Sequence, residues 1–109
     1  MQQINCVFDN RSSLYAAYMP FIKGGGLFIR TQPLYKLGIE LSLIINLMNE
    51  DELYCVDAKV VWITPIEAQA SRFPGIGVQF INDHGSDLRS KIEVYLAEML
   101  KSQQVTDTV

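Results

Sequence analysis

Residues Ile39–Leu47, with the sequence IELSLIINL, decide the fold class because apolar side chains recur at every second position. The recurring set comprises Ile39, Leu41, Leu43, Ile45 and Leu47. Successive side chains of a β-strand point to opposite faces, so this alternation predicts a strand with one face on a hydrophobic core. The polar residues 49–52 (NEDE) follow directly and predict a hairpin with the next apolar stretch.

The same period appears on both sides of this segment. Three further sets alternate with more polar neighbours: Ile4, Cys6 and Phe8; Val56, Ala58, Val60 and Trp62; and Ile76, Val78 and Phe80. Beyond Lys59 both faces become apolar, because Val61 and Ile63 join the run. Gly75 and Gly77 lie opposite the last set, which indicates a bare sheet face that another group approaches closely.

Two segments near the N-terminus complete the strand pattern. Residues 24–26 (GGG) predict a tight turn ahead of a short strand over Leu27–Arg30. We interpret Leu14–Phe21 as another strand, although Ala16 and Ala17 also tolerate a helix. The pattern therefore predicts about six strands, all within the first 81 residues.

The C-terminal part changes to a helical period. Apolar residues recur on one helix face at Leu88, Ile92, Tyr95, Leu96 and Met99. Ser86 or Asp87 is expected to cap this helix, so residues 83–85 (DHG) are read as a turn before it. Residues 101–109 are expected to form a flexible tail. Many short strands followed by one amphipathic helix predict a mainly β fold, a small β-barrel with a helix packed on it.

Composition limits the classes of protein to consider. With 109 residues the chain forms one domain, and 49% hydrophobic against 19% charged residues excludes a disordered chain. The net charge of −3 argues against nucleic-acid binding, including a small oligonucleotide-binding barrel. The longest apolar run, Leu14–Ile22, is too short to insert into a membrane. Because residues 1–10 contain no basic side chain, no secretory signal is expected, and a cytoplasmic protein is predicted.

Signatures of catalysis are missing from the sequence. His84 is the single histidine and lacks the spacing of any metal site or catalytic triad. The glycines of residues 24–26 are followed by a strand, whereas a phosphate-binding loop leads through Gly-Lys-Ser/Thr into a helix. We therefore expect a protein that is not an enzyme and that needs no cofactor and no metal.

The most distinctive stretch is Leu14–Ile22, because aromatic and apolar residues crowd into it. In an extended segment only half of them can face a core, and exposed Tyr, Trp and Met are favoured at protein interfaces. Composition alone leaves core and interface equally open for these side chains. We predict the following residues to face a partner: Tyr15, Tyr18, Met19, Phe21 and Trp62. Arg11 and Lys23 are candidates for the rim, and Gly24, Gly25 and Gly26 are assigned to the turn.

Three stretches together carry a resemblance to a known family: residues 14–29 (LYAAYMPFIKGGGLFI), 59–65 (KVVWITP) and 75–80 (GIGVQF). The sequence resembles the PilZ domain family, over about Ile4–Leu100, and within it the members that serve type IV pilus biogenesis. The resemblance implies a six-stranded antiparallel β-barrel with one C-terminal α-helix. It assigns residues 1–100 to the domain and leaves residues 101–109 as the tail.

The sequence departs from the pattern of those family members that bind cyclic di-GMP. They use Arg-x-x-x-Arg upstream of an Asp/Asn-x-Ser-x-x-Gly turn, because the arginine fork holds guanine or phosphate with two bonds. In the matching turn here, Phe21 replaces the acid or amide, Lys23 replaces the serine, and only Gly26 remains. Arg11 is the sole upstream arginine, with Tyr15 four residues later. Each of the two bidentate arginine contacts is worth about 1–3 kcal/mol, so their loss predicts no meaningful direct binding of cyclic di-GMP.

The pilus members of the family resemble this sequence and imply a different role. They act as adaptors that bind the pilus assembly ATPase PilB and the degenerate EAL domain of FimX, which itself senses cyclic di-GMP. We therefore expect a non-enzymatic adaptor in type IV pilus assembly and twitching motility. The alternative is a direct cyclic di-GMP receptor with an atypical site.

Overall fold

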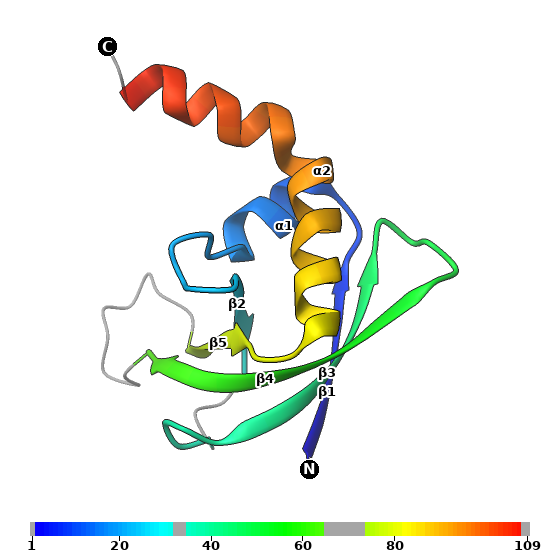
Figure 1. The fold of residues 1–109 in the computed structure, drawn as a ribbon, viewed down its shortest axis with the longest axis vertical. Helices are drawn as coiled ribbons and strands as arrows, with labels where there is room; N and C mark the ends of the chain where they lie inside the picture. Colours follow the sequence, from blue (N-terminus) through cyan, green and yellow to red (C-terminus); the bar gives the residue numbers. More distant parts are fainter. Residues whose placement is uncertain (1, 32–34, 65–73, 108–109) are drawn as a thin grey trace.

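The computed structural model describes residues 2–31, 35–64 and 74–107, of which 102–107 are described as helical backbone only. Two helices and five strands follow one another in this part of the chain (Figure 1). Their order is β1 (Gln2–Phe8), α1 (Arg11–Ala17), β2 (Gly26–Arg30), β3 (Glu40–Leu47), β4 (Leu53–Ile63), β5 (Gly75–Phe80) and α2 (Asp83–Asp107). The fold is mainly β with a C-terminal helix, as predicted.

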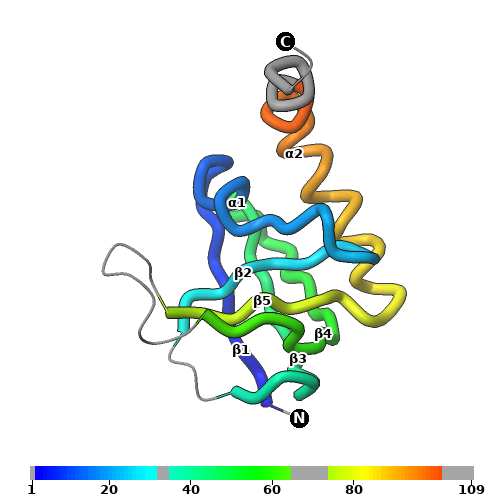
Figure 2. The backbone as a smooth tube through the Cα atoms, turned by 90° about the vertical axis from the view of Figure 1, so that its left-hand side faces the viewer, coloured from blue at the N-terminus to red at the C-terminus, as the bar shows by residue number. Residues whose placement is uncertain are grey.

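The strands form one curled sheet in the order β1-β3-β4-β5-β2 (Figures 1 and 2). This differs from the predicted six-stranded antiparallel barrel in two respects. The described residues contain five strands, and β1 pairs with β3 in parallel, whereas the other neighbours are antiparallel. The outermost strands, β1 and β2, are not paired with each other in the described part of the chain, so the sheet is an incompletely closed barrel.

The missing strand is accounted for by α1, because part of the predicted strand Leu14–Phe21 is helical. Asn10 caps this helix: its side-chain oxygen accepts a hydrogen bond of 2.8 Å from the backbone N–H of Ser13. The helical spacing places Leu14 and Ala17 on the core, and both are buried. The cap at Asn10 and the helix-forming residues Ala16 and Ala17 therefore favour a helix here over the predicted strand.

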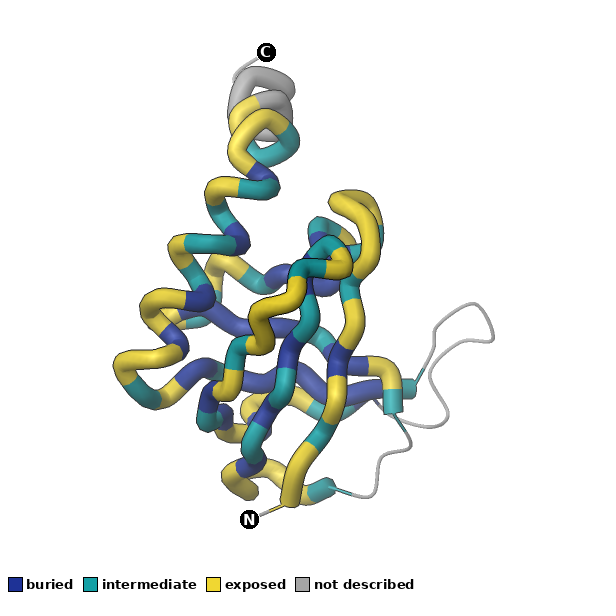
Figure 3. Tube along the Cα trace, turned by 90° about the vertical axis from the view of Figure 1, so that its right-hand side faces the viewer, coloured by how far each residue is buried: buried dark blue, intermediate teal, exposed yellow. Residues whose placement is uncertain are grey.

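The hydrophobic core lies between the inner face of the sheet and one face of α2 (Figure 3). The alternation that predicted β3 is confirmed: Leu41, Leu43, Ile45 and Leu47 are completely buried, while Ile39 precedes the strand and is exposed. In the predicted helix, Leu88, Ile92 and Leu96 are completely buried, and Tyr95 and Met99 pack at the margin of the core. Both periodic patterns therefore predicted the correct faces.

Helix α2 begins earlier than the sequence predicts. Asp83, His84 and Gly85 form its first turn, and the side-chain oxygen of Asn82 accepts a hydrogen bond of 3.1 Å from the N–H of Gly85. The prediction of a cap at Ser86 or Asp87 is therefore wrong, since Asn82 caps one turn earlier. The helix continues to Asp107 and its last turns extend away from the sheet (Figure 1). Residues 108–109 lie outside the described residues, and the flexibility of the tail stays a prediction.

In the described residues, neither helix combines the length and the apolar character that crossing a membrane requires.

Candidate functional site

Five apolar side chains gather on the outer surface of the sheet around a cavity of about 330 Å³. They come from the turn after α1 and from the end of β4: Met19, Phe21, Ile22, Val61 and Trp62. We call this set the apolar patch. Phe21 is 79% exposed and Trp62 is 51% exposed, although both are large aromatic residues. Such exposed aromatic surface is typical of a protein interface.

Trp62 lies in the apolar patch because β4 contains a β-bulge. The pairing with β5 runs regularly up to Val60, which faces Val78, and then shifts so that Trp62 faces Gly77. An extra residue in one strand reverses the inside–outside alternation beyond it. The sequence pattern had grouped Trp62 with the buried residues of β4. Val61, which the interface prediction missed, is exposed at the bulge, where both faces of the strand had become apolar.

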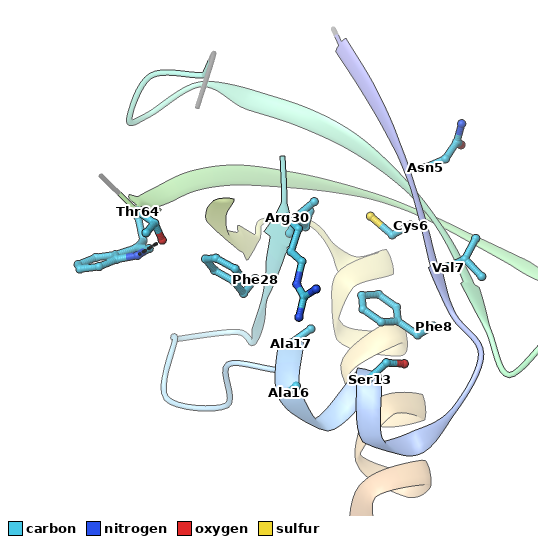
Figure 4. Close-up of a pocket in the computed structure, with 12 residues that line it drawn as sticks. Asn5, Cys6, Val7, Phe8, Ser13, Ala16, Ala17, Phe28, Arg30 and Thr64 are labelled. Carbon is cyan, nitrogen blue, oxygen red and sulfur yellow. Dashed lines mark hydrogen bonds between the residues drawn. The ribbon is translucent and has the colours of Figure 1, made fainter. Parts of the chain in front are cut away.

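The absence of a side chain at Gly77 shapes the floor of the patch. A Cβ at this position would lie 3.0 Å from the Cβ of Trp62 and 3.3 Å from the Sδ and Cε atoms of Met19. The thioether of Met19 therefore lies against bare backbone of β5, as the glycine pattern of this strand indicated. Trp62 is further oriented because its Nε1–H donates a hydrogen bond of 3.3 Å to the Thr64 hydroxyl (Figure 4).

The turn that carries Phe21 is held by backbone hydrogen bonds at both ends. The N–H of Met19 donates to the carbonyl of Gly26 at 2.9 Å, and the N–H of Phe80 donates to the carbonyl of Gly25 at 3.0 Å. Gly24 and Gly25 have φ angles of 82° and 88°, which side chains rarely tolerate. Phe21 is therefore presented from a well-anchored turn that needs little ordering when a partner binds.

Two of the predicted partner-facing residues lie elsewhere. Tyr18 is only 6% exposed, belongs to the core, and donates a hydrogen bond of 2.6 Å from its hydroxyl to the carboxylate of Glu93 on α2. Burial, together with this bond, raises the pKa of Tyr18 to about 12. Tyr15 on α1 is half-buried and packs against the margin of the core. The structure thus brings together Met19, Phe21 and Trp62, and it adds Ile22 and Val61.

The side chains expected at the rim, Arg11 and Lys23, are both exposed. Arg11 is the first residue of α1. Lys23 lies in the turn and its carbonyl accepts a hydrogen bond of 2.8 Å from the side-chain nitrogen of Gln79. Among the described residues no group of three or more His, Cys, Asp and Glu side chains could hold a metal ion.

A second, larger cavity of about 670 Å³ lies between the two outermost strands of the sheet (Figure 4). Residues 5–8 of β1 and 28–30 of β2 line it, and α1 contributes Ser13, Ala16 and Ala17. Trp62 and Thr64 complete the described lining, so Trp62 borders both this cavity and the apolar patch. We call this cavity the seam groove, because it occupies the place where the curled sheet would close. Cys6 and Phe8 reach into it from β1 and Arg30 from β2 (Figure 4).

The chain matches a known protein family, whereas no curated protein sequence matches it significantly. The matching family is described as the PilZ domain, and the match covers residues 2–98. This range includes both the apolar patch and the seam groove, and it agrees with the resemblance derived from residues 14–29, 59–65 and 75–80. The chain therefore belongs to the PilZ domain family.

Proposed function

We propose that this chain is a non-enzymatic, cytoplasmic adaptor in type IV pilus assembly and twitching motility. In this role it binds the pilus ATPase PilB and the EAL domain of FimX, and does not bind cyclic di-GMP directly. Membership of the PilZ domain family supports the general part of the proposal, because PilZ domains are binding and adaptor domains connected with cyclic di-GMP signalling. The partners and the pathway rest on the similarity to the pilus members of the family.

The observation that carries the proposal is the apolar patch. Phe21 stands where cyclic di-GMP receptors have an acid or an amide, and its ring is 79% exposed beside Trp62. An aromatic surface without paired arginines suits a protein, which buries apolar area, better than a ligand carrying two phosphates. We therefore assign the patch to at least one of the two proposed partners.

The proposal is tested with the double variant Phe21→Ala and Trp62→Ala. Both side chains are exposed, so the variant should fold like the wild type, which circular dichroism verifies. Central aromatic residues of interfaces contribute about 2–4 kcal/mol each when truncated, so calorimetry should show at least one partner, purified PilB or the FimX EAL domain, binding about a thousandfold more weakly. Tyr15→Ala is less informative, because the half-buried ring also supports the core.

Leu53→Ala is the matched control, because Leu53 is 54% exposed on β4 but lies outside the apolar patch. It should bind both partners with wild-type affinity. Unchanged binding of both partners by the folded double variant would show that the patch is not the docking surface. A titration of the wild type with cyclic di-GMP completes the test, since micromolar binding would establish a direct receptor instead.

A further inference from the structure

The turn between α1 and β2 is contacted near both of its ends by side chains of α2. We call residues 18–26 the aromatic turn, because it supplies three of the five side chains of the apolar patch. Tyr18 begins this turn, and its hydroxyl donates a hydrogen bond of 2.6 Å to Oε2 of Glu93. Near the other end, the side chain of Arg89 lies against the backbone of Gly25.

The contact at Gly25 is close because this residue has no side chain. A Cβ at this position would lie 3.1 Å from Cδ and 3.2 Å from Cγ of Arg89. The carbonyl of Gly25 accepts a hydrogen bond of 3.0 Å from the N–H of Phe80, which follows β5 directly into the core. The aliphatic part of the Arg89 side chain therefore covers the backbone at the point where the aromatic turn joins the sheet.

One carboxylate oxygen connects the two contacts. Oε2 of Glu93 accepts the hydrogen bond from Tyr18, and Nε of Arg89 lies 3.4 Å from the same oxygen. Arg89 and Glu93 are neighbours on the surface of α2, because they are four positions apart in a helix. Their side chains are 41% and 42% exposed, and such a pair contributes little to the stability of a whole domain. We therefore expect its main effect on the turn that it contacts.

We propose that Arg89 and Glu93 are positioning residues, which hold the aromatic turn in the conformation that forms the apolar patch. Neither residue lines the patch, so both act through the turn and not by contact with a partner. A turn that is already ordered in the free chain lowers the entropy cost of binding. The consequence for PilB and FimX rests on the proposed function, whereas the order of the turn is a property of the free chain.

The test compares Arg89→Ala with Lys91→Ala. Lys91 provides the matched control, because it lies on the same helix, its side chain is 40% exposed, and its Nζ lies 3.5 Å from the carboxylate of Glu50. Each substitution removes one partly exposed ion pair, but Lys91 pairs with the turn between β3 and β4 and not with the aromatic turn. Neither side chain is buried, so circular dichroism should show that both variants are folded.

The order of the aromatic turn is measured in the free chain by nitrogen-15 relaxation. The backbone amides of residues 19–25 should have order parameters of about 0.85 in the wild type and in Lys91→Ala. In Arg89→Ala these values should fall toward about 0.6, because the cover over the turn is removed. Glu93→Ala should have the same effect, since it removes the shared acceptor. Arg89→Lys should keep most of the order, because it retains an aliphatic stem and a positive charge.

Partner binding provides a second measurement, which a general loss of stability would not reproduce. Arg89→Ala should weaken the binding of the partner that uses the apolar patch by about three- to tenfold, because that partner must now order the turn. In the Phe21→Ala background the same substitution should weaken binding by less than about twofold, because the ring that the turn presents is missing. Lys91→Ala should bind with wild-type affinity.

Two results would overturn the proposal. Equal order parameters in Arg89→Ala and in the wild type would show that backbone hydrogen bonds alone hold the turn. An equal loss of affinity with and without the Phe21 ring would show that Arg89 contacts the partner directly or acts on the whole fold. Failure of the proposed function gives a different result: the wild type binds neither partner, or the double variant binds both. The order parameters of residues 19–25 still decide the positioning role in that case.

Discussion

At the scale of single residues, Gly77 and Trp62 show how small local features create the apolar patch. The missing side chain at Gly77 lets Met19 approach the backbone of β5, and the bulge beside Val61 turns Trp62 outward. The first feature was predictable, because a glycine opposite an apolar strand face indicates a close approach. The second was not, since no residue in β4 marks the register shift. A bulge is decided by the pairing of two strands rather than by one of them.

Tyr18 provides a prediction about pH at this scale. Its pKa is raised from the usual 10.0 to about 12 in the folded protein. The unfolded chain therefore loses this proton first, and the free energy of unfolding falls as the pH rises from about 10 to about 12. Tyr18→Phe should flatten this alkaline loss of stability. At about pH 7 it should cost about 1 kcal/mol, because the hydrogen bond to Glu93 is removed.

Urea denaturation across the alkaline range measures this effect. Part of the decrease in the free energy of unfolding with rising pH should remain in the variant, because burial raises the pKa of Cys6 to about 11. An alkaline slope that is equally steep in Tyr18→Phe and in the wild type would mean that Tyr18 is not the source of the effect.

At the scale of elements, both helices owe their positions to the side chains that they bury. The helical period predicted the buried face of α2, including Leu88 and Ile92, because such periodicity is a property of a continuous segment. The helix α1 was predicted as part of a strand. Its seven residues are too few for a clear period, and the cap at Asn10 together with packing against α2 decides the outcome.

The contribution of α2 to stability is testable with two substitutions on the same helix. Ile92 is completely buried, and Ile92→Ala should lower the free energy of unfolding by about 2–5 kcal/mol because it leaves a cavity. Val94 is 74% exposed, and Val94→Ala should change the free energy of unfolding by less than about 0.5 kcal/mol. Chemical denaturation gives both values. Similar losses in the two variants would contradict the packing of α2 on the sheet.

At the scale of the whole molecule, the incomplete closure of the sheet separates central strands from edge strands. In the described part of the chain, β3 and β4 have neighbours on both sides, whereas β1 and β2 each have one strand neighbour. Amide hydrogen exchange should therefore be slowest in β3 and β4 and faster in β1 and β2, because edges open at lower free energy. Mass spectrometry or magnetic resonance can measure this order. Amides in β1 protected as strongly as those in β3 would indicate that something already covers this edge.

Much of this protein could be derived from its sequence alone. The buried faces of β3, β5 and α2, and the resemblance to the PilZ domain family over about Ile4–Leu100, follow from patterns in short continuous segments. The family match over residues 2–98 confirms that resemblance. Only the tertiary structure decided that Tyr18 faces Glu93, that Trp62 leaves the core, and that β1 and β2 border an open groove. These features arise between segments far apart in the chain, as with the 75 positions that separate Tyr18 from Glu93. Local periodicity reports which face of an element is buried, but it carries no information about the partner or the register of that element.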